Sequence, residues 1–212
     1  MQHAMQLYQG ATFFLIPMEG MNGFYEKFGF QITGVKIHRF YTNAIKKCAL
    51  DKAYTATHTV KVVESNHCSD VLAFAIQCYG KETGGLFQTM LNDQGLVWLS
   101  VSSDQGLQGI IAYKQTREKV KISTFCATSL DIARALLCKC VTVSTEGSQF
   151  KIGFPSFNQA NCVELYKEIL ESGTEWQTTE DVMATNGYMP TPSNWEQLFG
   201  IFHCCLVCSN WP

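Results

Sequence analysis

The chain has 212 residues, of which 46% are hydrophobic and 16% are charged, so it can bury a sizeable core and is not of the disordered class. A formal net charge of -2 argues against a general nucleic-acid binder. No positively charged region precedes the short apolar stretch from Thr12 to Met18, so we expect a cytoplasmic protein that binds no membrane.

The ten cysteines raise the question of disulfides or metal. A chain of this length, with this many hydrophobic residues, is not a small secreted domain held together by disulfides, so we expect reduced thiols. The local clusters Cys138-x-Cys140 and Cys204-Cys205-x-x-Cys208 lack a second ligand pair at zinc-finger spacing. We therefore expect cysteine to serve as a small buried apolar residue, and we predict no metal site.

The first predicted unit is strand, short helix, strand. An apolar run from Thr12 to Ile16 ends at Pro17, as a buried strand does. Residues Met21, Phe24, Tyr25 and Phe28 then share one helical face, and Gly29 is the expected helix stop. A second strand is predicted over residues 32–40.

Between residues 42 and 59 the pattern becomes polar and loses its periodicity, which indicates a connector. We place a domain boundary near residue 56, giving one unit over residues 1–56 and another over residues 57–212. The expected elements of the second unit are a strand at 60–63, two helices ending near Gly80 and Leu91, strands at 96–102, 108–114 and 119–126, a helix opened by Thr128 and Asp131, a strand at 150–154, a helix capped by Asn158, and final strands around 175–184 and 199–207.

The sequence F-Y-E-K-F-G-F at residues 24–30 resembles the last conserved motif of the GNAT (GCN5-related) N-acetyltransferase superfamily. The resemblance implies transfer of an acyl group from acetyl-CoA, as co-substrate, to an amine on a small molecule or a protein. That motif normally lies near the end of the domain. The chain therefore resembles an acetyltransferase that lacks its beginning, with the phosphate-binding half of the cofactor cleft before Met1 and residues 12–40 forming the wall at its thiol end.

The element order of the second unit is also that of a GNAT fold, and residues 12–40 echo residues 149–184. The whole resembles a tandem acetyltransferase with a degenerate, YitH-like C-terminal domain, on the evidence of Gly84-Gly85, the hairpin at 104–113, Pro155-x-x-Asn158 and Leu198-Phe199-Gly200-Ile201. The expected fold class is α/β with a mixed sheet, as the C-terminal remnant of one GNAT domain followed by a complete GNAT-like domain.

Tyr25 is the candidate catalytic residue. It matches the tyrosine of the superfamily motif, which the resemblance places beside the coenzyme sulfur as a general acid. The alternative is that Tyr25 is an aromatic residue at the edge of the core, and both interpretations stay open. Tyr166 lies at a comparable position in the second unit, but its spacing favours core packing.

The superfamily binds the coenzyme pyrophosphate on a Q/R-x-x-G-x-G/A loop. The corresponding residues here, 125–129, read Phe-Cys-Ala-Thr-Ser and contain no glycine. Backbone with Cβ atoms approaches a diphosphate poorly, so cofactor-binding residues stay unknown and Thr128 and Ser129 are expected to cap a helix.

Other polar residues have simpler explanations than catalysis. Carboxylates at Glu19 and Glu26 are usually solvated charges, Asn22 does not match the family position, and a lone histidine such as His38 is more often structural. His58, His67 and His203 show no metal-like spacing, and the tryptophans, Trp98 among them, are expected in the core or at an interface.

The strand at residues 12–16 has no preceding partner strand, and an unpaired apolar edge favours aggregation. We expect it to pair with the second unit or with another chain, or to be covered by a missing N-terminal segment. Two functions remain open: an acyl-CoA-dependent N-acetyltransferase, incomplete as encoded, or a non-catalytic GNAT-like module that binds a small ligand or a partner.

Overall fold

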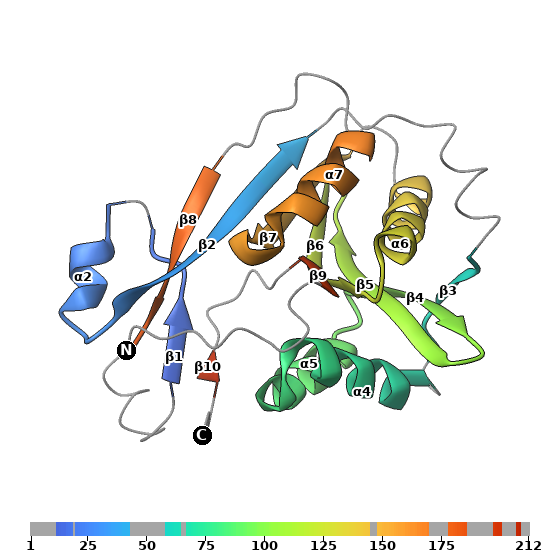
Figure 1. Ribbon diagram of the computed structural model, residues 1–212, viewed down its shortest axis with the longest axis horizontal. Helices are drawn as coiled ribbons and strands as arrows, with labels where there is room; N and C mark the ends of the chain where they lie inside the picture. Colours follow the sequence, from blue (N-terminus) through green and yellow to red (C-terminus); the bar gives the residue numbers. More distant parts are fainter. Residues whose placement is uncertain are drawn as a thin grey trace.

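The computed structural model describes residues 12–18, 20–42, 58–64, 67–144, 148–169, 178–185, 197–200 and 207–208. A long mixed sheet runs through the molecule, with helices on both of its faces (Figure 1). The strand order is β10-β1-β8-β2-β7-β6-β5-β4-β3, and β9 pairs with β6 beside this path. The predicted α/β fold class with a mixed sheet is confirmed.

The predicted strand, short helix and strand of residues 12–40 are present. Strand β1 (Thr12–Leu15) is followed by helix α2 (Asn22–Glu26) and strand β2 (Gln31–Thr42), which is longer than expected. Helix α2 ends in a turn in which the Gly29 N–H donates to the Glu26 carbonyl at 2.9 Å. The φ angle of Gly29 is +85°, a conformation that glycine adopts without strain, so this residue stops the helix and turns the chain into β2.

The second unit begins with β3 (Val60–Val62), α4 (Cys68–Tyr79) and α5 (Gly84–Leu91), and continues with the antiparallel strands β4 (Val97–Ser103), β5 (Gly106–Gln115) and β6 (Lys119–Ala127). It ends with α6 (Leu130–Val143), β7 (Gln149–Pro155), the 3-10 turn η3 (Ser156–Asn158), α7 (Gln159–Ile169), β8 (Thr178–Ala184), β9 (Leu198–Gly200) and β10 (Val207–Cys208). The single strand predicted around residues 199–207 is wrong in this respect: β9 and β10 are separate strands, because β9 pairs with β6 and β10 pairs with β1. The other element types predicted for described residues are present.

Two local predictions need correction. The residue that caps α6 is Ser129 and not Thr128, because the Ser129 hydroxyl accepts a hydrogen bond from the Ile132 N–H. The pair Gly84-Gly85 opens α5 instead of preceding it, after a short 3-10 turn at Lys81–Thr83. Residues 43–57, which contain the predicted connector and domain boundary, lie outside the described residues, and so do Trp176, Trp195 and Trp211.

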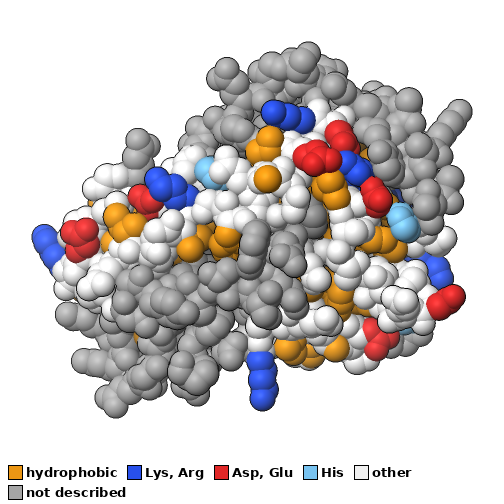
Figure 2. All heavy atoms as spheres, viewed as in Figure 1, with side chains coloured by type: hydrophobic (Ala, Val, Ile, Leu, Met, Phe, Trp, Pro, Cys, Tyr) orange, Lys and Arg blue, Asp and Glu red, His pale blue; other side chains and the backbone are white. Residues whose placement is uncertain are grey.

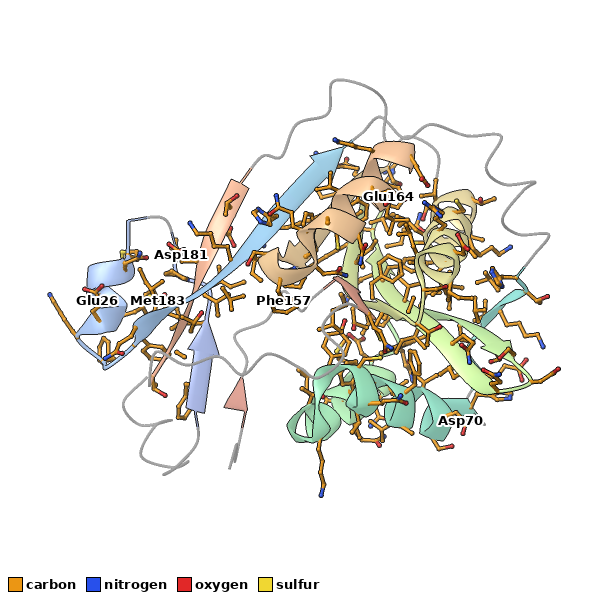
Figure 3. All side chains as sticks on the ribbon, in the orientation of Figure 1. Glu26, Asp70, Phe157, Glu164, Asp181 and Met183 are labelled. Atoms are coloured by element: carbon orange, nitrogen blue, oxygen red, sulfur yellow. The ribbon has the colours of Figure 1, made fainter. Side chains whose placement is uncertain are left out.

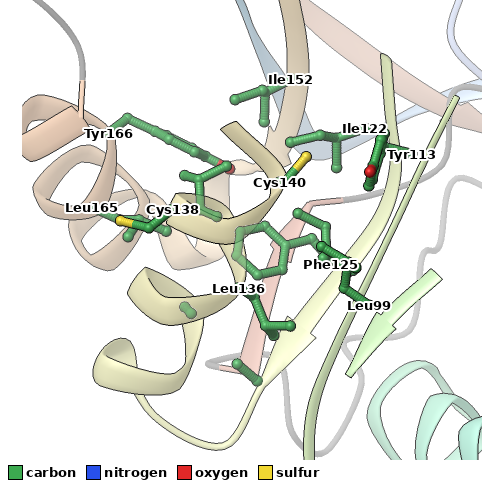
Figure 4. Packing of buried hydrophobic residues seen from close by; sticks show 14 of the residues in the cluster. Leu99, Tyr113, Ile122, Phe125, Leu136, Cys138, Cys140, Ile152, Leu165 and Tyr166 are labelled. Carbon is green, nitrogen blue, oxygen red and sulfur yellow. The ribbon is translucent and has the colours of Figure 1, made fainter. Parts of the chain in front are cut away.

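Two large apolar clusters lie on opposite faces of the sheet, which makes the fold three layers. The first packs α6 and α7 against the sheet and includes Phe125, Leu136 and Tyr166 (Figure 4). The second packs α4 and α5 against the other face and includes Phe87 and Trp98. Successive side chains of the central strands point to opposite faces of the sheet. Because helices cover both faces, neighbouring residues of one strand are both buried.

A third, smaller cluster lies under α2. It contains Phe13, Leu15, Phe30 and Met183, with the half-buried Tyr25 at its margin. Met183 belongs to β8 and lies between Leu15 on one side and β2 on the other in the sheet register. Figure 3 shows Met183 beside α2. The first unit is thus completed by a strand from far along the chain.

The two strand–helix–strand units interleave. Their strands appear in the order β1-β8-β2-β7, and each neighbouring pair is antiparallel. If β1 is exchanged with β7 and β2 with β8, the order becomes β7-β2-β8-β1, which is the same order read from the other end. The second strand of each strand–helix–strand segment therefore lies between the two strands of the other.

Candidate functional site

Tyr25 lies on α2, at the rim of the small cluster beneath that helix. Its ring meets the edge of Phe24 at a centroid distance of 5.3 Å and that of Phe30 at 6.2 Å. The side chain is half-buried, and its neighbour Phe24 is 45% exposed. Part of the Tyr25 ring therefore packs in the core while the residue keeps contact with solvent, which both interpretations of this tyrosine require.

Tyr166 occupies the corresponding helix of the second unit but has a different environment. It is 1% exposed and packs on Phe154 at a centroid distance of 5.6 Å. Figure 4 shows its ring directed from α7 into the cluster between α6 and the sheet. Burial raises the pKa of the Tyr166 phenol well above its ordinary value. The predicted core role of Tyr166 is confirmed, and this phenol has no access to a substrate.

The sheet divides where β6 and β7 cease to pair. These parallel strands are in register only from Lys119 to Lys121 against Gln149 to Lys151, although both continue further. A register irregularity in β6 between Ile122 and Thr124 bends this strand. We call the region beyond this point the β6–β7 fork.

Strand β9 fills the β6–β7 fork from the β6 side. It runs antiparallel to β6, with Gly200 opposite Phe125 and Leu198 opposite Cys126. Figure 1 shows β9 between β6 and β7. Leu198 is 1% exposed and belongs to the cluster beneath α4 and α5. The chain itself therefore takes up the space that the diverging strands leave.

Asn158 anchors β9 from the β7 side, and sequence patterns did not reveal this role. The Asn158 side-chain amide donates to the Leu198 carbonyl at 2.9 Å, and its own carbonyl oxygen accepts from the Asn161 amide at 2.8 Å. Asn158 is 2% exposed. A turn signal before a helix predicts a cap, and it carries no information about a partner 40 residues away in the sequence.

Tyr79, at the end of α4, forms hydrogen bonds with the bent part of β6. Its phenol oxygen accepts from the Thr124 hydroxyl at 2.8 Å and from the Phe125 N–H at 3.1 Å. Burial raises the pKa of Tyr79 well above its ordinary value, so the phenol stays protonated. The Phe125 N–H, a backbone donor at the fork, is thereby already bonded and is not free to bind a substrate oxygen.

The loop from β6 to α6 offers little to a diphosphate. The Thr128 N–H donates to the Gln108 carbonyl at 2.8 Å, and the Ser129 hydroxyl caps the Ile132 N–H at 3.3 Å. Asp131 adds a carboxylate in the first turn of α6. The Ser129 hydroxyl and the Asp131 carboxylate already complement the free N–H groups and the positive dipole end of α6. The predicted capping role of Ser129 is confirmed.

Carboxylates also surround Arg134, which joins α6 and α7. Arg134 binds Asp131 at 2.8 Å, Glu164 at 2.9 Å and Glu168 at 2.6 Å. Figure 2 shows acidic and basic side chains mixed over this face. Because Arg134 is matched by three carboxylates, the local field near the α6 start does not attract a further anion.

Cys126 lies on β6 at the fork and is fully buried. Burial and the neighbouring Cys78 thiol raise the pKa of Cys126 well above its ordinary value of 9.0. The thiol is therefore protonated at neutral pH and is not a nucleophile. Cys138 and Cys140 are also buried, as predicted.

The other candidates are dispersed. His38 lies on the part of β2 that pairs with β7, where its Nδ1 is 3.1 Å from the Thr179 hydroxyl. Burial and then the Lys36 charge lower the pKa of His38, and a hydrogen bond with Gln159 opposes them. Asn22 and Glu26 lie on α2 with Tyr25, and the side chain of Glu19 lies outside the described residues, as does His203.

His58 and His67 fall in separate segments of the chain, before β3 and at the start of α4. Within the described ranges, no group of three or more His, Cys, Asp or Glu side chains is arranged to hold a metal ion. No helix of that same part of the chain has the length and apolar character needed to cross a membrane.

No protein-family model and no curated protein matches this chain. Among solved structures, a conserved protein of unknown function from Staphylococcus epidermidis gives a TM-score of 0.61 at 14% identity, covering 86% of this chain and 76% of that one. A GCN5-related N-acetyltransferase from Sphaerobacter thermophilus gives 0.60 at 14% identity, covering 86% of this chain and 63% of that one.

A putative acetyltransferase from Pyrococcus horikoshii gives a TM-score of 0.58 at 16% identity, covering 91% of this chain and 58% of that one. The chain thus spans less than two thirds of the length of these two acetyltransferase structures. At such identities the likeness concerns the fold alone. This protein has the mixed α/β fold of the GCN5-related N-acetyltransferases.

Proposed function

We propose that this protein takes part in acyl-CoA-dependent N-acyl transfer, and that the transfer site lies beside α2 and not at the β6–β7 fork. The observation that carries this proposal is the contrast between two related tyrosines on an acetyltransferase fold. Tyr25 is half-buried at the rim of its cluster, whereas Tyr166 is sealed in the core. Only the first can meet a substrate.

The proposed role of Tyr25 is proton donation to the departing thiolate of coenzyme A. Acyl transfer to an amine requires removal of a proton from that amine, a donor to the carbonyl oxygen, and neutralisation of the leaving sulfur. A phenol can supply the last of these, and the rings of Phe24 and Phe30 hold that of Tyr25 in place. The acceptor amine, on a small molecule or a protein, is part of the proposal by resemblance only.

The test is a titration of the full chain with acetyl-CoA. A ligand present at about 100 times its dissociation constant stabilises the protein by about 2.7 kcal/mol, so binding raises the temperature of thermal unfolding. Tyr25→Phe should keep this stabilisation. It should lower the rate at which acetyl groups are transferred to a panel of primary amines, measured as release of coenzyme A thiol, by about 100-fold. Tyr113→Phe, a buried tyrosine in β5, is the matched control and should leave the rate unchanged.

A second candidate is a non-catalytic module with an acetyltransferase fold. The filled β6–β7 fork favours it, because β9 occupies the space between the diverging strands. Absence of any thermal shift at millimolar acetyl-CoA would contradict the first proposal and leave this second one. A shift that occurs with unchanged turnover in Tyr25→Phe would keep acyl-CoA binding and remove the role of Tyr25.

A further inference from the structure

Strand β9 contacts the β6–β7 fork in the way that a bound peptide contacts a protein. Its backbone extends the edge of β6 through two antiparallel residue pairs, Phe125 with Gly200 and Cys126 with Leu198, with a register shift between them. The carbonyl and the side chain of Leu198 are also contacted by residues of other elements. In sequence, Leu198 lies 72 residues beyond its partner Cys126.

The fork supplies a specific donor for the β9 backbone. The Asn158 amide, on a side chain that is 2% exposed, donates to the Leu198 carbonyl at 2.9 Å. The Cys162 thiol approaches the same oxygen at 3.9 Å. Asn158 is oriented in turn by the amide of Asn161. Asn158 therefore presents a buried and oriented amide donor to the backbone carbonyl of Leu198, which differs from an incidental contact at the surface.

The fork also supplies a pocket for one apolar side chain. Leu198 is 1% exposed and lies in the cluster that contains Phe74, Tyr79 and Cys126, with Phe157 packed against it. Figure 3 shows Phe157 at the start of α7. The residue before Leu198 is also bound, because the Cys78 thiol donates to the Gln197 side-chain oxygen at 3.4 Å.

We infer that the β6–β7 fork is a peptide-binding site, and that residues 197–200 are its resident ligand. Backbone pairing gives the affinity, and the Leu198 pocket with the Asn158 amide gives the specificity, as in other sites that add a strand to a sheet edge. This site takes an extended apolar peptide and not a thioester. The inference is independent of the proposed transfer site at α2, since it concerns other elements.

The first test uses Leu198→Asp in the full chain. A carboxylate at this buried position should expel the segment, because an unpaired buried charge is strongly unfavourable. Hydrogen exchange in residues 119–127 should then become faster. A synthetic peptide with the sequence of residues 194–202, Asn-Trp-Glu-Gln-Leu-Phe-Gly-Ile-Phe, should bind the variant one to one and restore slow exchange.

Wild-type protein should bind the same labelled peptide at least 100-fold more weakly, since its own segment competes at millimolar effective concentration. A peptide carrying Asp at the Leu198 position should bind neither protein. Unchanged exchange in residues 119–127 of a folded Leu198→Asp variant would overturn the inference. So would a folded variant with faster exchange that binds no peptide.

Asn158→Ala provides a second test that does not depend on the folding of Leu198→Asp. It removes the amide that binds the Leu198 carbonyl, so exchange in residues 119–127 should become roughly tenfold faster, as expected for one lost buried hydrogen bond. Asn92→Ala, at the exposed end of α5, is the matched control and should change nothing there. Equal exchange in both variants would overturn the inference.

Discussion

At the scale of single residues, the buried ionisable groups are structural and not catalytic. Burial raises the pKa of Tyr79, Tyr166, Cys126 and Cys162 well above their ordinary values, and it raises that of Tyr113 to about 12. All these groups are therefore neutral at physiological pH. The half-buried Tyr25 differs from them in its environment, which is why it carries the proposed chemistry.

These raised values predict that stability falls at alkaline pH. The folded protein keeps the thiols and phenols protonated, whereas the unfolded chain ionises from pH 9.0 for cysteine and 10.0 for tyrosine. The unfolded state then binds fewer protons, so the free energy of unfolding decreases as the pH rises above about 9. The thiols of Cys126 and Cys162 should each contribute to this loss of stability between pH 9 and pH 10.5.

Urea unfolding at pH 8.0 and at pH 10.5 measures this effect. Cys162→Val, which replaces a buried thiol by an apolar side chain, should show a smaller decrease than the wild type. A free energy of unfolding that is the same at both pH values would show that these groups are not protonated and buried as described.

At the scale of elements, the packing of α6 on β5 depends on a glycine. A Cβ atom built on Gly109 would lie 2.6 Å from Ile132 Cγ2 and 2.9 Å from Leu136 Cδ1. Ile132 is β-branched and has little freedom to move, so α6 itself would have to shift. The close approach of this helix to the sheet therefore requires glycine.

Gly109→Ala should lower the free energy of unfolding by about 1–3 kcal/mol, the usual effect of overpacking a core. Gly85→Ala is the matched control, since it lies in α5 with no atom within 4 Å of the added Cβ. That change should be neutral or stabilising by up to about 1 kcal/mol, because alanine favours a helix. Both values come from chemical denaturation, and equal stabilities would contradict the described packing.

Local sequence patterns predicted most elements but not their long-range partners. The three strands predicted over residues 96–126 and the helix predicted to end near Gly80 depend on local signals, and these elements form as predicted. The roles of Asn158 and Tyr79 were missed, because each binds backbone more than 35 residues away. No local pattern encodes such a partner.

At the scale of the whole molecule, the sheet is built from two interleaved units. The apolar edge of β1 finds a partner in β8, as one of the alternatives for the strand at residues 12–16 predicted. The Thr185 N–H also donates to the Phe13 carbonyl at 3.1 Å, and the Phe13 N–H donates to the Thr185 hydroxyl at 3.2 Å. The first unit and the C-terminal part of the second therefore complete one sheet.

Interleaving also separates the two candidate sites. In the sheet order, β8, β2 and β7 lie between β1 and the β6–β7 fork. A ligand beside α2 and a peptide in the fork would thus contact different strands. We propose that acyl-CoA binds beside α2 while the fork holds residues 197–200.

Hydrogen exchange of the full chain with and without millimolar acetyl-CoA distinguishes binding beside α2 from binding in the fork. We predict slower exchange in residues 12–32 and unchanged exchange in residues 119–129 and 149–158. Slower exchange at residues 119–129, with release of protection in residues 197–200, would contradict the claim, because acetyl-CoA would then replace β9 in the fork.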